Sequence, residues 1–225
     1  MQKKLIISIG TGRCGSVSLS KFLSAQRSVQ MLHEGRLDSH KLRKLIKWNN
    51  DEEELLSWLN FLLKQENNNE YIGDTGMYFL PYIDLIIKKH PNVRVIVMVR
   101  DKKEVVKSYL KKTEGRNHWF KHDGKKWDFD NKWDPCYPKY NIENKEEALE
   151  KYWDEYLQET NNLSKKYPEN IKIWTIQDLN SEDGKNNILD FLNYKHQRSI
   201  DKEFKHNTKL KSQKESIINK IKKWF

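Results

Sequence analysis

The architecture of this chain is best read from residues 5–18, Leu5-Ile6-Ile7-Ser8-Ile9-Gly10-Thr11-Gly12-Arg13-Cys14-Gly15-Ser16-Val17-Ser18. Residues 5–9 are mostly apolar and β-branched and end at a glycine, which predicts a short buried strand. After the glycines, residues 16–25 carry apolar side chains at helical spacing. A strand, a glycine loop and a helix in this order are typical of a parallel α/β sheet, where backbone N–H groups and a helix N-terminus can bind an anion.

The alternation of strand and helix continues along the chain. Further strands are predicted at 28–32, 71–74, 93–99 and 171–176, and further helices at 38–66, 79–90, 102–112, 146–167, 186–192 and 208–225. Residues 113–143 have no clear period, which predicts a long loop or lid. We therefore expect a single α/β domain over residues 1–225, with three layers and a central, mostly parallel sheet of about 4–5 strands flanked by helices.

Composition excludes several classes of protein. The 225 residues include 8 Trp, 10 Tyr and 8 Phe, which argues against a disordered chain. Two cysteines are too few for a disulfide scaffold or a cysteine-rich zinc site, and the seven histidines form no recognisable metal motif. The N-terminal apolar run is too short for a secretory signal, and no stretch approaches the length of a membrane span, so the sequence predicts a soluble, cytoplasmic protein.

The positive charge is unevenly distributed. The chain has a formal net charge of +10, of which residues 195–225 carry +7. This excess suits nucleic acid, an acidic membrane surface or a polyanionic small ligand, and it equally suits a solvated lysine-rich helix. Charge alone does not choose among them.

The glycine loop admits two interpretations. The spacing Gly10-x-Gly12-x-x-Gly15 matches the dinucleotide fingerprint, and Glu34 follows 19 residues later, near the position of a ribose-binding acid. A nicotinamide-dependent oxidoreductase is therefore one hypothesis.

The side chains of the loop favour the second interpretation. Arg13 lies inside the loop, and Ser16 and Ser18 open the helix. A cation with two hydroxyls suits a terminal phosphate or sulfate better than a pyrophosphate that is approached by bare backbone. No Gly-Lys-Ser/Thr sequence ends the loop, so an ordinary nucleotide kinase or ATPase is not expected.

A second constellation follows the most apolar strand. Arg100 leaves the carboxyl end of strand 93–99, and Ser108 lies about two turns into the next helix. At the carboxyl edge of a parallel sheet, both side chains can converge on one phosphate. The alternative is that Arg100 pairs with a carboxylate such as Asp101.

Together these motifs resemble those of the sulfotransferases that use 3′-phosphoadenosine 5′-phosphosulfate (PAPS). Residues 11–18 are similar to their 5′-phosphosulfate loop, and Arg100 with Ser108 is similar to their 3′-phosphate motif. Similarity extends through 79–94 and 152–179, so that it covers most of residues 5–193. The resemblance implies a P-loop-like three-layer fold and in-line transfer of a sulfuryl group to a hydroxyl or amine of a small-molecule or glycan acceptor. It implies no metal, and we expect no nucleic-acid partner.

The resemblance also implies roles for individual residues. Arg13 would stabilise the charge that develops on the departing phosphate, which makes it both a catalytic and a donor-binding candidate. The other donor-binding candidates of the loop are Cys14, Gly15, Ser16, Val17 and Ser18. Lys209, near Lys205, His206 and Asn207, is a donor-binding candidate by its position alone.

Two groups compete for the role of general base. Glu34 resembles the acidic base of protein-tyrosine and related sulfotransferases, and His33 is the alternative because histidine serves this purpose in the cytosolic branch. A surface turn is the plain alternative for both. His118, in the aromatic and basic segment 113–143, is either a further catalytic histidine or a structural hydrogen-bonding group, and this segment could shape the acceptor pocket.

The chain departs from the family pattern in three ways, one of which is that the lysine-rich C-terminal loop of the cytosolic branch, with its glycine-rich clamp, is not recognisable. Asp74-Thr75-Gly76 stands where related enzymes often have Lys-Thr-Pro, and Gln177 replaces an acid at the corner that follows the last strand. Asp74 could orient Arg13 or bind the acceptor.

Overall fold

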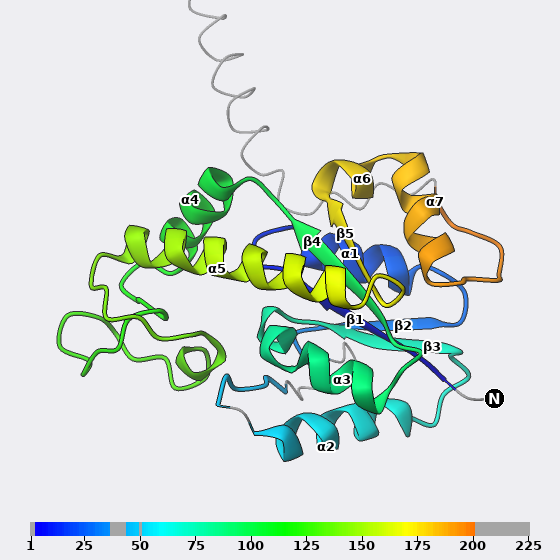
Figure 1. Cartoon of the computed structure of the whole chain (residues 1–225), viewed down its shortest axis with the longest axis horizontal. Coiled ribbons are helices and arrows are strands. Elements are labelled where there is room, and N and C mark those ends of the chain that lie inside the picture. Colours follow the sequence, from blue (N-terminus) through cyan, green and yellow to red (C-terminus); the bar gives the residue numbers. More distant parts are fainter. Residues whose placement is uncertain (1–2, 37–43, 50, 201–225) are drawn as a thin grey trace, which may run out of the picture.

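A five-stranded sheet forms the centre of the molecule. The structure, a computed structural model, describes residues 3–36, 44–49 and 51–200. Within them all neighbouring strands are parallel, in the order β2-β3-β1-β4-β5 (Figure 1). The strands are β1 (Lys4–Ile9), β2 (Val29–His33), β3 (Tyr71–Thr75), β4 (Arg94–Val99) and β5 (Ile171–Thr175). The expectation of a parallel α/β sheet is confirmed.

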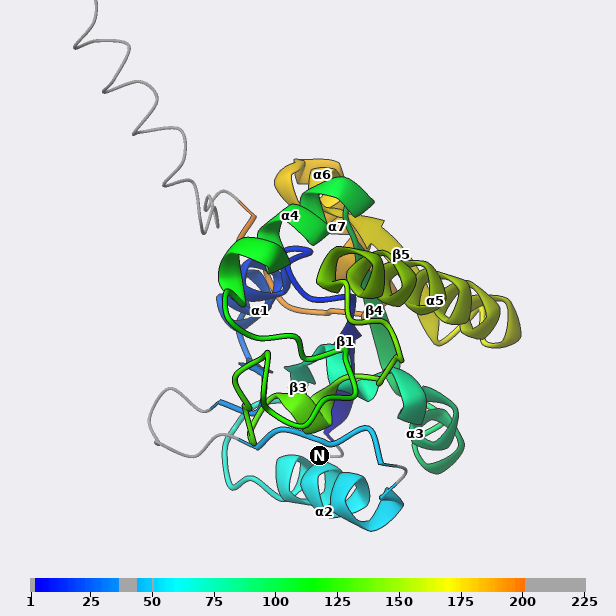
Figure 2. The ribbon, with the colours of Figure 1, turned by 90° about the vertical axis from the view of Figure 1, so that its left-hand side faces the viewer.

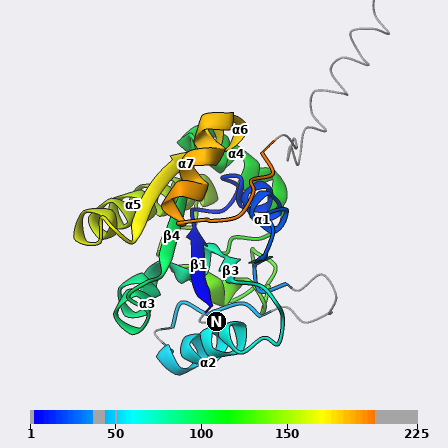
Figure 3. The ribbon, with the colours of Figure 1, turned by 90° about the vertical axis from the view of Figure 1, so that its right-hand side faces the viewer.

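Helices cover both faces of this sheet, and this makes the three layers that the sequence predicts (Figures 1 and 3). One face packs against α1 (Ser16–Ser24), α6 (Ile176–Asn180) and α7 (Glu182–Phe191). The other face packs against α2 (Glu52–Leu63), the 3₁₀ helix η1 (Met77–Tyr82), α3 (Ile83–Lys89) and α5 (Lys145–Lys166). Successive side chains of a strand point to opposite faces, so Ile6 enters the first core and Ile7 the second.

The strands point their carboxyl ends toward one side of the molecule. There α4 (Lys102–Lys112) contacts α5, and the loop 113–143 follows α4 on the same side (Figures 1 and 2). Apart from a 3₁₀ turn at Asp134–Cys136, this loop has no helix, as its aperiodic sequence predicts. Ligands of open parallel sheets bind at this edge.

The prediction of a helix over 38–66 is wrong for residues 44–49. Residues 44–49 are irregular because their polar groups bond to distant segments: Lys44 N–H donates to Gly35 O and Trp48 N–H to Pro135 O. The helix begins only at Glu52, where the Asp51 carboxylate accepts from Glu54 N–H. Ile46 is nevertheless buried, so apolar spacing alone cannot distinguish a helix from a core-lining irregular segment. Residues 37–43 lie outside the described chain.

Most remaining elements lie close to their predicted positions, but the short helix α6 was not predicted and α7 begins at Glu182 instead of 186. The helix that was expected at 79–90 opens as η1, which contains Pro81, before α3 begins. The predicted helix 208–225 lies outside the described residues. Among the helices of the described part, none is long and apolar enough to cross a membrane.

Candidate functional site

The glycine loop between β1 and α1 turns through left-handed backbone. Gly12 and Gly15 have φ values of 79° and 99°, and Arg13 between them has a φ of 58°, which is uncommon for a residue with a side chain. A Cβ atom on Gly12 would lie 2.0 Å from the Tyr109 hydroxyl oxygen. The loop therefore needs glycine here because it passes directly over a tyrosine.

Three buried tyrosines hold this loop in place. The Tyr109 and Tyr152 hydroxyls donate to the Thr11 carbonyl oxygen at 2.7 and 3.1 Å, and Gly10 N–H donates to the Tyr156 hydroxyl at 3.1 Å. Burial raises the pKa of all three, so they remain neutral. None of the three was predicted as a site residue, although Tyr152 and Tyr156 are four residues apart on one helix face.

Both predicted anion-binding motifs meet at Arg13. Its Nε donates to Ser108 Oγ at 2.9 Å, and Arg100 Nη1 donates to the Arg13 carbonyl oxygen at 3.1 Å. Arg100 Nε also pairs with Glu104 at 2.7 Å, so the carboxylate partner is Glu104 and not Asp101. Two guanidinium groups and a hydroxyl thus lie together at the carboxyl edge of the sheet. They come from the glycine loop, from the residue that follows β4 and from α4.

The amino end of α1 adjoins this cluster. Gly15 precedes the helix and has no side chain to cap its first amides, and the first turn of α1 contains no acidic residue. The backbone N–H groups of Ser16, Val17 and Ser18 are therefore suited to an anion. Cys14 is only 1% exposed, and burial raises the pKa of its thiol to about 11, so it packs as a neutral group.

The two candidate bases lie in the turn that follows β2. Arg36 N–H donates to the His33 carbonyl oxygen at 3.2 Å, and Glu34 and Gly35 have φ values of 53° and 64°. A bonded four-residue turn with positive φ at both central positions is a type I′ turn. His33 Nε2 lies 3.0 Å from Ser16 Oγ, and His33 Nδ1 lies 3.7 Å from Glu34 Oε2. The His33 imidazole thus lies between the Glu34 carboxylate and Ser16 of the glycine loop.

Asp74 makes neither of the contacts that the sequence suggested for it, with Arg13 or with the acceptor. Its carboxylate is 0% exposed, so it cannot contact an acceptor directly, and no hydrogen bond in the described chain joins it to Arg13. It accepts instead from Gly35 N–H at 3.1 and 3.0 Å, from Trp58 Nε1 at 3.2 Å and from the Tyr78 hydroxyl at 3.2 Å. Burial raises the pKa of Asp74 to about 6, while these donors oppose the shift.

His118 lies inside the long loop. It is 3% exposed, its Nδ1 lies 2.5 Å from Asp134 Oδ1, and its ring stacks on Tyr137. Burial lowers the pKa of this imidazole more than Asp134 raises it. Its contacts are those of a structural hydrogen-bonding group, the alternative already considered for it. Lys209, the remaining donor candidate, lies outside the described residues.

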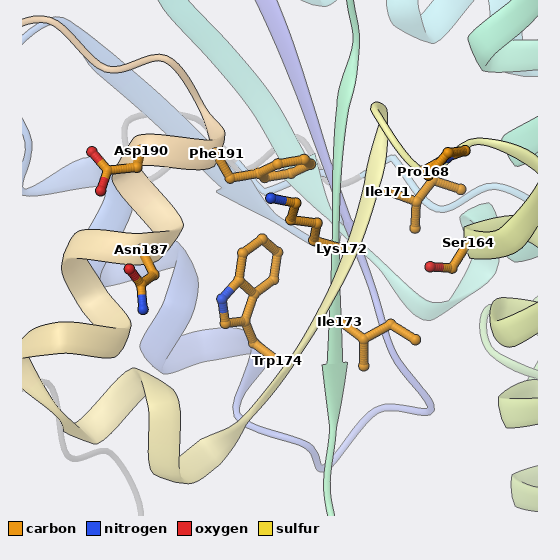
Figure 4. Close-up of a pocket in the computed structure, with 9 residues that line it drawn as sticks. All are labelled: Ser164, Pro168, Ile171, Lys172, Ile173, Trp174, Asn187, Asp190 and Phe191. Carbon is orange, nitrogen blue, oxygen red and sulfur yellow. The ribbon is translucent and has the colours of Figure 1, made fainter.

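A surface hollow lies away from these groups, at the open edge of β5 (Figure 4). It lies between the end of α5 and the side of α7, and none of the predicted site residues lines it. Its lining residues are Ser164, Pro168, Ile171, Lys172, Ile173, Trp174, Asn187, Asp190 and Phe191.

The topology argues against the dinucleotide hypothesis. In the Rossmann arrangement the second strand lies directly beside the first, whereas here β3 separates β1 from β2. Glu34, at the end of β2, is therefore not in the place of the ribose-binding acid. In the described ranges, no group of three His, Cys, Asp or Glu side chains could hold a metal ion.

Comparisons with known proteins agree with this topology. Neither the family models nor the curated proteins give a significant match. A sulfotransferase from Alicyclobacillus acidocaldarius matches 96% of this chain and 90% of its own, with a TM-score of 0.51 and 12% identity. The chain has the sulfotransferase fold. A sulfotransferase from Mycobacterium tuberculosis H37Rv has a TM-score of 0.53 and 15% identity, with 86% of this chain and 67% of that chain covered.

Proposed function

We propose that this protein transfers a sulfuryl group from PAPS to a hydroxyl or amine of a small-molecule or glycan acceptor. The observation that carries the proposal is the convergence of Arg13, Ser108 and Arg100 beside the uncapped amino end of α1. The sulfotransferase fold agrees with it.

The residues at this edge suit a donor with phosphates at both ends. The amides of Ser16, Val17 and Ser18 would bind the 5′-phosphosulfate, since a helix N-terminus favours anions. Arg100 and Ser108 would bind the 3′-phosphate, because guanidinium and hydroxyl groups are strong donors to phosphate oxygens. Arg13, whose backbone is fixed from behind by the tyrosines, would stabilise the charge on the leaving phosphate.

The acceptor must lose a proton as the new S–O or S–N bond forms. Glu34 is the proposed general base, because its carboxylate is on the turn next to Ser16 and is only partly buried. His33 is the second candidate, because it lies between Glu34 and Ser16.

The first test is donor binding. Thermal unfolding would be followed with 3′-phosphoadenosine 5′-phosphate, with AMP and with NAD. At about 100 times its dissociation constant, a true ligand stabilises the native state by roughly 2.7 kcal/mol. A shift with the bisphosphate alone supports the proposal, whereas an equal shift with NAD supports an oxidoreductase.

Replacement of Arg100 tests the proposed 3′-phosphate site independently of the lysine-rich residues 195–225. Arg100→Ala should weaken bisphosphate binding by roughly tenfold or more, the usual scale for a lost charged hydrogen bond. Unchanged affinity in calorimetry would remove Arg100 and Ser108 from the 3′-phosphate site. A steep salt dependence of RNA or DNA binding would instead favour a nucleic-acid-binding protein.

A further inference from the structure

The Glu34 turn is held by a carboxylate that the sulfotransferase chemistry itself does not use. Asp74 lies near the carboxyl end of β3, where it pairs in register with Leu32 of β2 and Ile7 of β1. It is fully buried, and both of its oxygens lie within 3.1 Å of Gly35 N. We propose that Asp74 is a positioning residue that holds the Glu34 side chain toward the acceptor. This inference rests on the proposed function and on Glu34 as its base.

Backbone strain is the first argument. Glu34 has a φ of 53°, in the left-handed region that residues with side chains avoid. Such a conformation costs free energy and persists only where the surrounding structure holds it in place. Two bonds to β3 supply this constraint: Glu34 N–H donates to Thr75 O at 2.8 Å, and Gly35 N–H donates to Asp74. The turn is therefore fastened to the sheet on both sides of the Glu34 Cα.

The second argument is the environment of the carboxylate. An ionised carboxylate without exposure is costly unless it is fully hydrogen-bonded. Besides Gly35, its donors come from two other elements, Trp58 of α2 and Tyr78 of η1. Asp74 thus ties α2, η1 and the turn to one point of the sheet. A neutral amide at this position would offer a single acceptor oxygen to three donors.

Close packing gives a third argument. A Cβ atom on Gly35 would lie 1.8 Å from the Lys44 carbonyl oxygen, and Lys44 N–H donates to Gly35 O at 3.2 Å. Lys44 therefore contacts the turn through its own backbone, in addition to the bonds from β3. With the backbone bonded to both segments, the direction in which the Glu34 Cα–Cβ bond leaves the turn is set by the fold.

The test is a double-mutant cycle between Asp74→Asn and Glu34→Gln. The readouts are bisphosphate affinity by calorimetry and the release of radioactive sulfate from labelled PAPS, with water as acceptor. Asp74→Asn should lower turnover by roughly 10- to 100-fold with donor affinity unchanged, since a displacement of about 1 Å has effects of this size. The double variant should be no slower than Glu34→Gln alone, because Asp74 acts through Glu34.

Tyr71→Phe is the matched control. Tyr71 lies on the same strand, is fully buried and donates to Asn193 O at 2.8 Å, but it pairs with Lys4 and Val29 at the opposite end of the sheet. It should leave turnover unchanged. Equal losses in both variants, unchanged turnover in Asp74→Asn, or multiplied losses in the double variant would overturn the proposal.

Amide hydrogen exchange tests the positioning without any catalytic assay. The Gly35 amide should exchange roughly tenfold faster in Asp74→Asn, while amides of β1 keep their wild-type rates. Unchanged Gly35 exchange overturns the proposal even in an active enzyme. If the wild type neither binds the bisphosphate nor releases sulfate, the proposed function fails, and faster Gly35 exchange still supports Asp74 as the residue that fixes this turn.

Discussion

Arg13 and Glu34 occupy the same unusual backbone conformation in two different turns. Both have φ values near 55°, and both carry a charge at the carboxyl edge of the sheet. The Arg13 loop is held by tyrosine hydroxyls that stay neutral, whereas the Glu34 turn is held by the ionisable Asp74. The comparison shows that two turns with a similar φ can be held by different kinds of group. The supports of the Arg13 loop stay neutral, whereas the support of the Glu34 turn can change its charge with pH.

Among the substitutions in these two turns, Glu34→Gln should produce the largest effect, a loss of turnover. The substitution preserves size and removes the proton acceptor, so turnover should fall by roughly 10²-fold or more while donor affinity stays constant. Sulfate release and calorimetry measure the two quantities. His33→Asn made in parallel identifies the base: if it alone abolishes turnover, Glu34 is not the base.

The pH dependence of stability should expose the Asp74 turn. Its folded pKa of about 6 lies above the ordinary value of 3.8, so its protonated form stabilises the fold below pH 4, and this contribution is lost as pH rises through 6. The free energy of unfolding of wild type relative to Asp74→Asn should therefore fall by on the order of 3 kcal/mol between pH 4 and pH 7. Denaturant titrations at several pH values measure it. A flat difference would mean that Asp74 titrates near its ordinary pKa.

Gly35→Ala should show how tightly that turn is packed. Strain at positive φ and the clash with Lys44 O should lower the free energy of unfolding by about 2 kcal/mol or more. Gly115 is the control, because it has a φ of 74° but its Cβ would approach only the Asp128 side chain, at 3.0 Å. Gly115→Ala should cost about 1 kcal/mol. Equal losses would show that conformation alone, and not packing, limits the Glu34 turn.

Tyr109→Phe should give the smallest effect. The Thr11 carbonyl oxygen keeps its bond from Tyr152, so the loss is about 1 kcal/mol of stability, with a few-fold weaker bisphosphate binding. Tyr194→Phe is the control, because Tyr194 donates to Arg27 O at 3.0 Å and contacts none of the loop residues through a hydrogen bond in the described chain. If both variants weaken donor binding equally, the tyrosines do not hold the loop specifically.

The meeting of the two predicted anion-binding motifs could be expected from the sequence, because the residues of each motif are close together in the chain. Gly10 to Ser18 form one strand-loop-helix unit, and Arg100 and Ser108 follow one strand. Local spacing therefore places them at the same sheet edge.

The supports of both turns were beyond sequence reasoning. Tyr109, Tyr152 and Tyr156 reach the loop from residues 98 to 146 positions away, and Asp74 reaches Gly35 across 39. The Asp74 contact depends on the strand order, which places β3 beside β2, and the tyrosine contacts depend on the packing of α4 and α5 against the glycine loop. No local sequence pattern encodes either arrangement. The irregular path of 44–49 was missed for the same reason, since its hydrogen-bond partners are remote.

The open edge of the sheet has a consequence for the behaviour of the chain in crowded solution. Within the described residues, β5 bonds to β4 alone, and Ile173 is 38% exposed on it. An edge strand with exposed apolar residues is a template for cross-strand pairing between molecules. Lys172 belongs to this edge strand and has its ammonium 5.4 Å from the centre of the Phe191 ring. Charged side chains on an edge strand discourage a second strand from pairing with it. A lysine on an edge strand is one of the devices by which proteins resist sheet extension and aggregation.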